Sequence, residues 1–192
     1  MELVFATNNA NKAREINQIL GNSFNILTLK DIGFEGDIPE TQPTLEGNAL
    51  QKARYIVDRY NVACFADDTG LEISALNGAP GVYSARYAGP ERSAEANMAK
   101  VLSGLAQATD RSAQFRTAIA LILDGVEHVF EGKVEGRIGT EKSGAEGFGY
   151  DPIFYPEDAD RTFAEMSPDE KNAVSHRQRA VTAMVEFLRN RG

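Results

Sequence analysis

The segment VACFADDTG, residues 62–70, restricts the fold more than any other part of the chain. Its apolar half has the length of a buried strand and leads directly into two aspartates, Asp67 and Asp68. Adjacent negative charges at the exit of a buried strand repel each other unless a cation or several donors compensate. A turn explains one carboxylate, because Asp often hydrogen-bonds its own backbone there. The second carboxylate therefore indicates a metal ion or an activated water.

Residues 68–70 also spell Asp-Thr-Gly, the tripeptide of aspartic proteases, which use two such carboxylates that share a proton. This chain holds the tripeptide once, and its other segments are not those of a mostly-β protein. We therefore set the protease interpretation aside.

Composition limits the class of protein and its partners. A chain of 192 residues with 42% hydrophobic and 25% charged residues suits one globular domain, residues 1–192, or two small lobes around a cleft. The formal net charge of -8 disfavours nucleic acid and anionic membranes as partners, although a local basic cluster with a metal would still accept a small phosphorylated ligand. The N-terminus lacks the pattern of a signal peptide, so we expect a cytoplasmic protein.

Apolar runs and helical periodicity alternate along the chain. The expected strands are 2–6, 24–29 and 62–66, a possible continuation at 71–76, a hairpin around Asp124 and Gly125, and a short strand after 147–151. The expected helices are 13–20 with Gly21 as its stop, 45–60, one that begins after Ser93, and two that begin after Ser167 and Ser175.

Three polar segments are candidates for binding chemistry. Residues 7–12, TNNANK, join a strand to a helix, where backbone N–H groups and Lys12 suit phosphate oxygens; an ordinary polar turn is the alternative. Glu40 between two prolines fits either a solvated loop or a Mg²⁺ ligand, since Mg²⁺ needs few protein carboxylates. Phe148 between two glycines, followed by Asp151, fits either a stacking platform for a flat ligand or core packing. Lys171, His176 and Arg177 gather donors near a helix start.

Six segments, in order along nearly the whole chain, closely resemble the Ham1/RdgB family of non-canonical purine nucleoside triphosphate pyrophosphatases. They are TNNANK, the ET at Glu40, ADDTGLEI, GAPGVYSARYAG, GFGYDPIF and SHRQRA. The resemblance implies a two-lobed α/β fold with an elongated mixed central sheet, helices on its faces and a deep cleft, in a homodimer. It also implies Mg²⁺-dependent cleavage of ITP, dITP or XTP to the monophosphate and pyrophosphate.

The resemblance also implies roles for individual residues. Asp68 is the expected catalytic base, and Glu40 and Asp68 are the expected metal ligands. The expected substrate-binding residues are Thr7, Asn8, Asn9, Ala10, Asn11, Lys12, Lys52, Thr69, Phe148, Gly149, Tyr150, Asp151, Lys171, His176 and Arg177.

Two positions depart from the family pattern. Asn8 stands where the family commonly has glycine, and Gly47 stands where it usually has a second acid, which leaves Glu46 as the carboxylate there. Both departures concern the detail of phosphate and metal binding, since no expected catalytic group is lost. A phosphatase that releases orthophosphate and a nucleotide sensor without turnover are the rival hypotheses.

Overall fold

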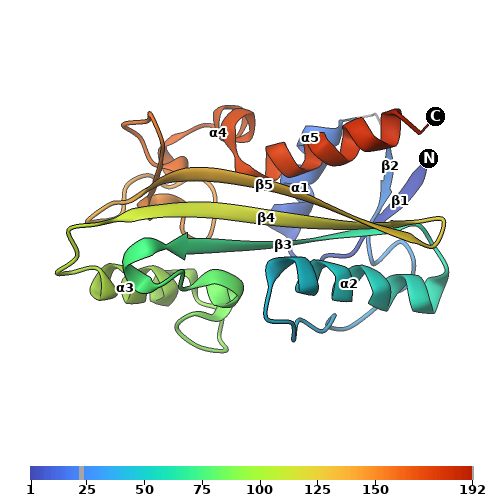
Figure 1. Cartoon of the computed structure of the whole chain (residues 1–192), viewed down its shortest axis with the longest axis horizontal. Coiled ribbons are helices and arrows are strands. Elements are labelled where there is room, and N and C mark those ends of the chain that lie inside the picture. Colours follow the sequence, from blue (N-terminus) through green and yellow to red (C-terminus); the bar gives the residue numbers. More distant parts are fainter. Residues whose placement is uncertain (22–23, 192) are drawn as a thin grey trace. The chain divides into compact units, whose positions relative to one another are not determined.

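The computed structural model describes residues 1–21 and 24–191 and shows a mixed α/β protein. One sheet has the strand order β2-β1-β3-β4-β5-β6 (Figure 1). The strands are β1 Glu2–Phe5, β2 Asn25–Leu27, β3 Cys64–Ile73, β4 Ser112–Leu123, β5 Val126–Ile138 and β6 Phe154–Pro156. Strand β1 pairs in parallel with β2 and β3, whereas β5 and β6 are antiparallel. The predicted α/β class with a mixed sheet and flanking helices is confirmed, and the cleft stays a prediction.

Local sequence signals set the helix boundaries. The α-helices are α1 Ala10–Leu20, α2 Leu45–Tyr60, α3 Ala94–Gly104, α4 Pro168–Val174 and α5 His176–Arg189. The side chains of Asn9, Thr44, Ser93 and Ser167 accept hydrogen bonds from the backbone N–H groups of the first turns, as N-caps do. The predicted starts after Ser93 and Ser167 and the stop at Gly21 are confirmed.

The chain divides into two compact units. Unit 1 comprises Met1–Asp68, Thr117–Gly132 and Arg177–Gly192, and unit 2 comprises Thr69–Arg116 and Lys133–His176. Strands β3, β4 and β5 contribute residues to both units, because three of the divisions fall inside them, and the fourth falls between His176 and Arg177 at the start of α5. Each unit has its own hydrophobic core.

In unit 1, helix α2 lies on one side of the strands and α5 on the other (Figure 1). The core under α1 and α5 consists of Leu3, Phe5, Ile16, Leu20, Phe65, Ile119, Leu121, Leu123, Ala180, Val181, Met184 and Leu188. The rings of Phe5 and Phe65 stack with their centroids 4.6 Å apart, which fixes β1 against β3. Helix α5 and strand β1 therefore contribute to one shared core.

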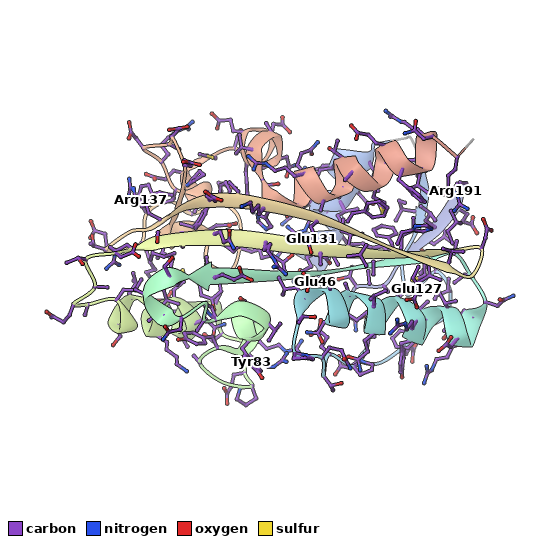
Figure 2. The ribbon with its side chains drawn as sticks, viewed as in Figure 1. Glu46, Tyr83, Glu127, Glu131, Arg137 and Arg191 are labelled. Carbon is purple, nitrogen blue, oxygen red and sulfur yellow. The ribbon has the colours of Figure 1, made fainter. Side chains whose placement is uncertain are left out.

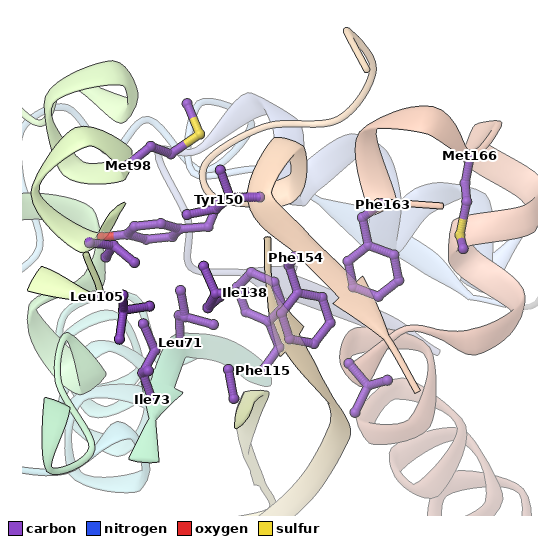
Figure 3. Packing of buried hydrophobic residues seen from close by; sticks show 14 residues of the cluster. Leu71, Ile73, Met98, Leu105, Phe115, Ile138, Tyr150, Phe154, Phe163 and Met166 are labelled. Atoms are coloured by element: carbon purple, nitrogen blue, oxygen red, sulfur yellow. The ribbon is translucent and has the colours of Figure 1, made fainter. Parts of the chain in front are cut away.

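In unit 2, aromatic side chains from distant segments form the centre of the core (Figure 3). The Phe115 ring centroid lies 4.7 Å from that of Phe154, and Phe154 lies 5.2 Å from Phe163. Tyr150 belongs to the same cluster, together with Leu71, Ile73, Met98, Val101, Leu105, Ala113, Val134, Ile138, Ile153 and Met166. This core anchors the loop that contains Tyr150.

Two expectations about strands were wrong, and one about a turn is confirmed. Strand β3 runs without interruption through both aspartates, so these residues lie inside a ten-residue strand and not at its end. Strand β2 has only three residues of the six expected. Asp124 and Gly125 both have positive φ, of 53° and 75°, as the predicted two-residue hairpin turn requires.

No helix in residues 1–21 and 24–191 combines the length and the apolar character needed to cross a membrane. The described part of the chain therefore offers no helical membrane span.

Gly70 gives a test of the packing in unit 2. A methyl group at this position would lie 2.6 Å from the carbonyl oxygen of Gly81, and backbone cannot swing aside as a side-chain tip can. We expect Gly70→Ala to lower the free energy of unfolding by about 1–3 kcal/mol in urea denaturation.

The matched control is Gly104→Ala, where the added methyl would meet only the tip of Leu76 at 3.2 Å. Alanine favours a helix over glycine by about 0.5–1 kcal/mol, so this variant should be as stable as the wild type or slightly more stable. A Gly70→Ala protein with wild-type stability would contradict the close backbone contact.

Candidate active site

The parallel pairing of β1 and β3 brings the first polar loop to the aspartates. Phe5 is in register with Phe65, and the Ala6 N–H donates to the Phe65 carbonyl at 2.8 Å. Because both strands run in the same direction, residues 7–12 leave β1 beside the point where β3 reaches Asp67. The sheet register therefore places Lys12 and Asp67 together.

Side chains within residues 7–12 organise the start of α1. The Asn9 side-chain oxygen accepts from the N–H groups of Asn11 and Lys12, at 3.0 and 3.2 Å. Thr7 Oγ1 accepts from the Asn9 N–H, and the Asn8 amide donates to the Gly36 carbonyl. Two of the backbone N–H groups at this helix start thus already have a protein partner. The positive charge of the loop comes from the Lys12 ammonium.

Asp67 holds two cations at one of its oxygens. Its Oδ2 lies 3.1 Å from Lys12 Nζ and 3.4 Å from Arg177 Nη2. The other arm of the Arg177 guanidinium binds Glu15, which lies one helical turn after Lys12. The Asp67 side chain has 0% of its surface exposed and the Arg177 side chain 1%. Alternating charges therefore connect α1, β3 and α5 in the interior of unit 1.

The cations keep Asp67 ionised. Burial alone would raise the pKa of its carboxyl group, but the charges of Lys12, Arg177 and Lys52 outweigh burial and hold that pKa well below its usual range. Burial also lowers the pKa of Lys12, and Asp67 opposes that effect. Each charge of this pair depends on the other.

Lys52 joins the two carboxylates that the sequence marked as metal ligands. Its Nζ lies 2.5 Å from Glu40 Oε1 and 3.7 Å from Asp68 Oδ1. Although burial would lower the pKa of Lys52, Asp68, Glu40 and Asp67 raise it above the ordinary value. Glu40 and Asp68, which are far apart in the sequence, thus meet at a single cationic group.

Asp68 has the opposite protonation tendency to Asp67. Burial raises the pKa of the Asp68 carboxyl group, Lys52 and Lys12 reduce that shift without cancelling it, and Glu40 adds to it. Two neighbouring carboxylates with pKa values pushed in opposite directions are typical of sites where one is a fixed charge and the other exchanges a proton.

Strand geometry explains this difference. Successive side chains of a strand point to opposite faces of its sheet. Asp67 meets Lys12 of α1 and Arg177 of α5, whereas Asp68 meets Asn48 and Lys52 of α2. Helices α2 and α5 lie on opposite sides of the strands (Figure 1), so adjacent aspartates occupy different environments.

Asn48 is a site residue that the sequence did not reveal. Its side chain is buried, its Nδ2 donates to Asp68 Oδ2 at 3.0 Å, and its Oδ1 accepts from the Gln42 N–H at 2.9 Å. One amide therefore orients Asp68 and fixes the loop that contains Glu40. The one available signal was the spacing of Asn48 and Lys52, one turn apart on a single helix.

Gly47, at the position of the family's usual second acid, packs against the Glu40 loop. A Cβ there would lie 2.8 Å from the Gln42 Cβ. The neighbouring Glu46 is half-buried at the start of α2 (Figure 2). Glycine at position 47 therefore allows the loop that contains Glu40 to approach α2 closely.

The available carboxylates suit Mg²⁺ better than a metal ion whose ligands all come from the protein. Among residues 1–21 and 24–191, no three His, Cys, Asp or Glu side chains form a group that could hold a metal. Mg²⁺ is commonly bound by one or two carboxylates together with substrate phosphates and water. Glu40 and Asp68, which already share one cation, match that requirement.

In unit 2, three of the predicted substrate-binding residues, Phe148, Asp151 and Lys171, form a second cluster. Lys171 Nζ lies 2.7 Å from Asp151 Oδ2, which also accepts from the Phe148 N–H at 2.8 Å. The same ammonium lies 4.8 Å from the centre of the Phe148 ring. Asp151 and Lys171 are buried and Phe148 is half-buried. This arrangement presents a partly accessible ring beside a fixed ammonium.

The other predicted residues of unit 2 lie in or near its core. Tyr150 is in the core, and its hydroxyl donates to the Ser84 carbonyl at 2.7 Å. His176 is buried and stacks on Phe115 with ring centroids 4.7 Å apart. Gly149 has a positive φ of 65°, and Thr69 is a half-buried residue of β3. We assign Thr69 no role beyond the one that the resemblance implies.

A cavity of about 950 Å³ lies elsewhere in unit 2. Its walls include Glu72, Gln114, Glu135, Arg137 and Tyr155. None of the predicted site residues that the structure describes is among those lining it. This cavity therefore belongs to neither cluster.

Together, the fold and the clusters define an α/β protein with a buried lysine and carboxylate cluster suited to a metal-bound polyphosphate. The Ham1 family model matches residues 3–187. A dITP/XTP pyrophosphatase of Flavobacterium johnsoniae is 52% identical over 188 residues, which cover 98% of each chain. A protein of the same name from Bacillus subtilis is 44% identical over 97% of this chain and 96% of its own. The Staphylococcus aureus Ham1 protein superposes with a TM-score of 0.91 at 40% identity over the full length of both chains.

The chain therefore belongs to the Ham1 family. The family predicted from six short segments is confirmed, and the solved relative shares the α/β fold.

Asn48 gives a stability test of the unit 1 cluster. Asn48→Ala removes a donor to Asp68 and an acceptor for the Gln42 N–H, and we expect a loss of about 1–3 kcal/mol in urea denaturation. Gln51→Ala is the matched control, because Gln51 binds Thr41 of the same loop from a more exposed position, without contact to Asp68. Equal losses in the two variants would show that Asn48 is only a loop anchor.

Proposed function

We propose that the chain hydrolyses the non-canonical purine nucleoside triphosphates ITP, dITP and XTP to the monophosphate and pyrophosphate, with Mg²⁺ as cofactor. Membership of the Ham1 family makes it an enzyme of the nucleoside triphosphate pyrophosphatase class. The name shared by its relatives, dITP/XTP pyrophosphatase, supports this choice of substrates. Such an activity would remove these nucleotides from the nucleotide pool.

The observation that carries the proposal is the meeting of Glu40, Lys52 and Asp68 at one point of unit 1. A triphosphate carries about four negative charges, and these repel an attacking water molecule. Lys52 and Lys12 would neutralise that charge as it moves toward the leaving pyrophosphate. The cluster thus supplies positive charge for the phosphates and carboxylates for a metal ion.

We assign Glu40 and Asp68 as the Mg²⁺ ligands. Lys52 occupies the position between the two carboxylates, which indicates a place where a cation is favoured. When bound, Mg²⁺ would screen the phosphate charge and act as a Lewis acid. A substrate phosphate would attract the Lys52 ammonium, so that lysine can serve the phosphates while the carboxylates serve the metal.

Asp68 would be the general base. Its side chain keeps 11% of its surface accessible beside Lys52 and Glu40, so it can reach the attacking water molecule. It would take a proton from the water that attacks phosphorus, while the bond between the α- and β-phosphates breaks and pyrophosphate leaves. Asn48 would keep its carboxylate oriented throughout.

The unit 2 cluster would select the base. The Phe148 ring would stack on the purine, and Lys171, held by Asp151, would donate to the 6-keto oxygen. The 6-amino group of adenine would instead meet a donor. A buried unpaired polar group costs about 1–3 kcal/mol, so one mismatch gives roughly five- to 150-fold discrimination. His176 and Arg177, for which the resemblance implies substrate binding, are buried outside this cluster, His176 against Phe115 and Arg177 between Asp67 and Glu15 in unit 1.

The homodimer and the cytoplasmic location implied by the sequence belong to the same proposal. Light scattering coupled to size exclusion would give the mass of the particle in solution.

Product analysis tests the reaction. With Mg²⁺, ITP and XTP should give the monophosphate and pyrophosphate, ATP should react far more slowly, and removal of Mg²⁺ by EDTA should abolish turnover. Release of orthophosphate would identify a phosphatase instead. Tight ITP binding without product over hours would identify a nucleotide sensor.

The Asp68→Asn variant tests the general base. Because the amide cannot accept the proton, kcat for ITP should fall by several orders of magnitude, about 10³-fold or more, with the fold intact by circular dichroism. Asp58→Asn, an exposed aspartate of α2, is the matched control and should keep wild-type kcat. Near-normal turnover of Asp68→Asn would remove Asp68 from the mechanism.

A further inference from the structure

We infer that Asp67 is a positioning residue, which holds Lys12 in place for the substrate phosphates and neither binds the metal nor accepts a proton. This inference rests on the proposed function, because it concerns the lysine that would bind the phosphates. It gives the first of the two adjacent aspartates a role distinct from that of the second.

Access separates Asp67 from the substrate. None of its side-chain surface is exposed, whereas the Asp68 side chain has 11% exposed. The Asp67 Oδ2 is engaged by both Lys12 and Arg177. A carboxylate enclosed by two cations would have to give up both before it could bind a metal ion.

Charge balance shows what Asp67 does for Lys12. Asp67 and Asp68 of β3, Lys52 of α2 and Arg177 of α5 all act electrostatically on the Lys12 ammonium. Burial, Lys52 and Arg177 disfavour its charge, and Asp67 is the strongest opposing influence. Without the Asp67 charge, Lys12 and Arg177 would face each other as buried like charges.

Arg177 is fixed from its far side by Glu15, so it is a stable support for Asp67. Lys12 and Glu15 are three residues apart on α1 and therefore lie on the same side of the helix. Three ion pairs connect Lys12 to Asp67, Asp67 to Arg177 and Arg177 to Glu15, so the series begins and ends on α1. It thereby fixes the first turn of α1, where Lys12 lies.

A purely structural role is the alternative, because loss of a buried ion pair destabilises many proteins. The two roles differ in what happens when Lys12 is absent. A positioning residue loses its effect on the substrate once the group it positions is gone, whereas a structural residue does not.

The experiment is a double-mutant cycle with Asp67→Asn, Lys12→Met and the double variant. The readouts are KM and kcat for ITP, and the affinity for inorganic pyrophosphate by calorimetry. Asp67→Asn should raise KM and weaken pyrophosphate binding by about tenfold or more, with a smaller loss of kcat than Asp68→Asn. The double variant should bind no more weakly than Lys12→Met alone.

Three results would overturn the inference. Additive losses in the double variant would show that Asp67 acts independently of Lys12. A loss of kcat as large as that of Asp68→Asn, with unchanged KM, would make Asp67 a catalytic group. Tighter pyrophosphate binding by Asp67→Asn would show that the carboxylate merely repels phosphate.

Instability of Asp67→Asn would also be informative. If the single variant does not fold, the double variant, which removes the opposed cation as well, should recover a cooperative thermal transition. A double variant that also fails to fold would contradict the inference. If the wild type binds pyrophosphate through Lys12 but turns over no ITP, the proposed function fails while the inference stands.

Discussion

The structure of unit 1 depends on the compensation of two adjacent buried carboxylates by lysines from two different helices. Strand β3 carries Asp67 and Asp68 through the interior, where an uncompensated charge would be too costly to bury. Lys12 and Arg177 meet the first, and Lys52 and Asn48 meet the second. The positions of α1, α2 and α5 against the sheet are thus tied to this one pair of residues.

The same compensation gives the two aspartates different chemistry. The alternation of side chains along a strand sends them to opposite faces, where one is enclosed by cations and the other is oriented by an amide beside a second acid. Asp67 therefore remains an anion, and Asp68, whose pKa is raised, is suited to exchange a proton. A fixed charge next to a carboxyl group with a raised pKa thus arises from two consecutive positions of one strand.

Much of the fold follows from local sequence, whereas the site depends on contacts between elements that are distant in the sequence. Capping residues such as Ser93 and Ser167 and the Asp124-Gly125 turn act within a few residues, so the sequence predicted them correctly. The continuity of β3 was missed, because two consecutive acids are typical of a strand end and their partners lie on other elements. Asn48 was missed for the same reason, since its role appears only when α2 lies beside β3. The joint position of Glu40 and Asp68 came from the family resemblance and not from any local pattern.

A crystal structure of the protein with Mg²⁺ and a non-hydrolysable ITP analogue would test the division of roles most directly. We expect Glu40 and Asp68 to bind the metal ion, Lys12 to contact a phosphate, and Asp67 to remain in contact with Lys12 and Arg177. A metal ion bound by Asp67, or a Glu40 carboxylate turned away from the ion, would contradict the assignment.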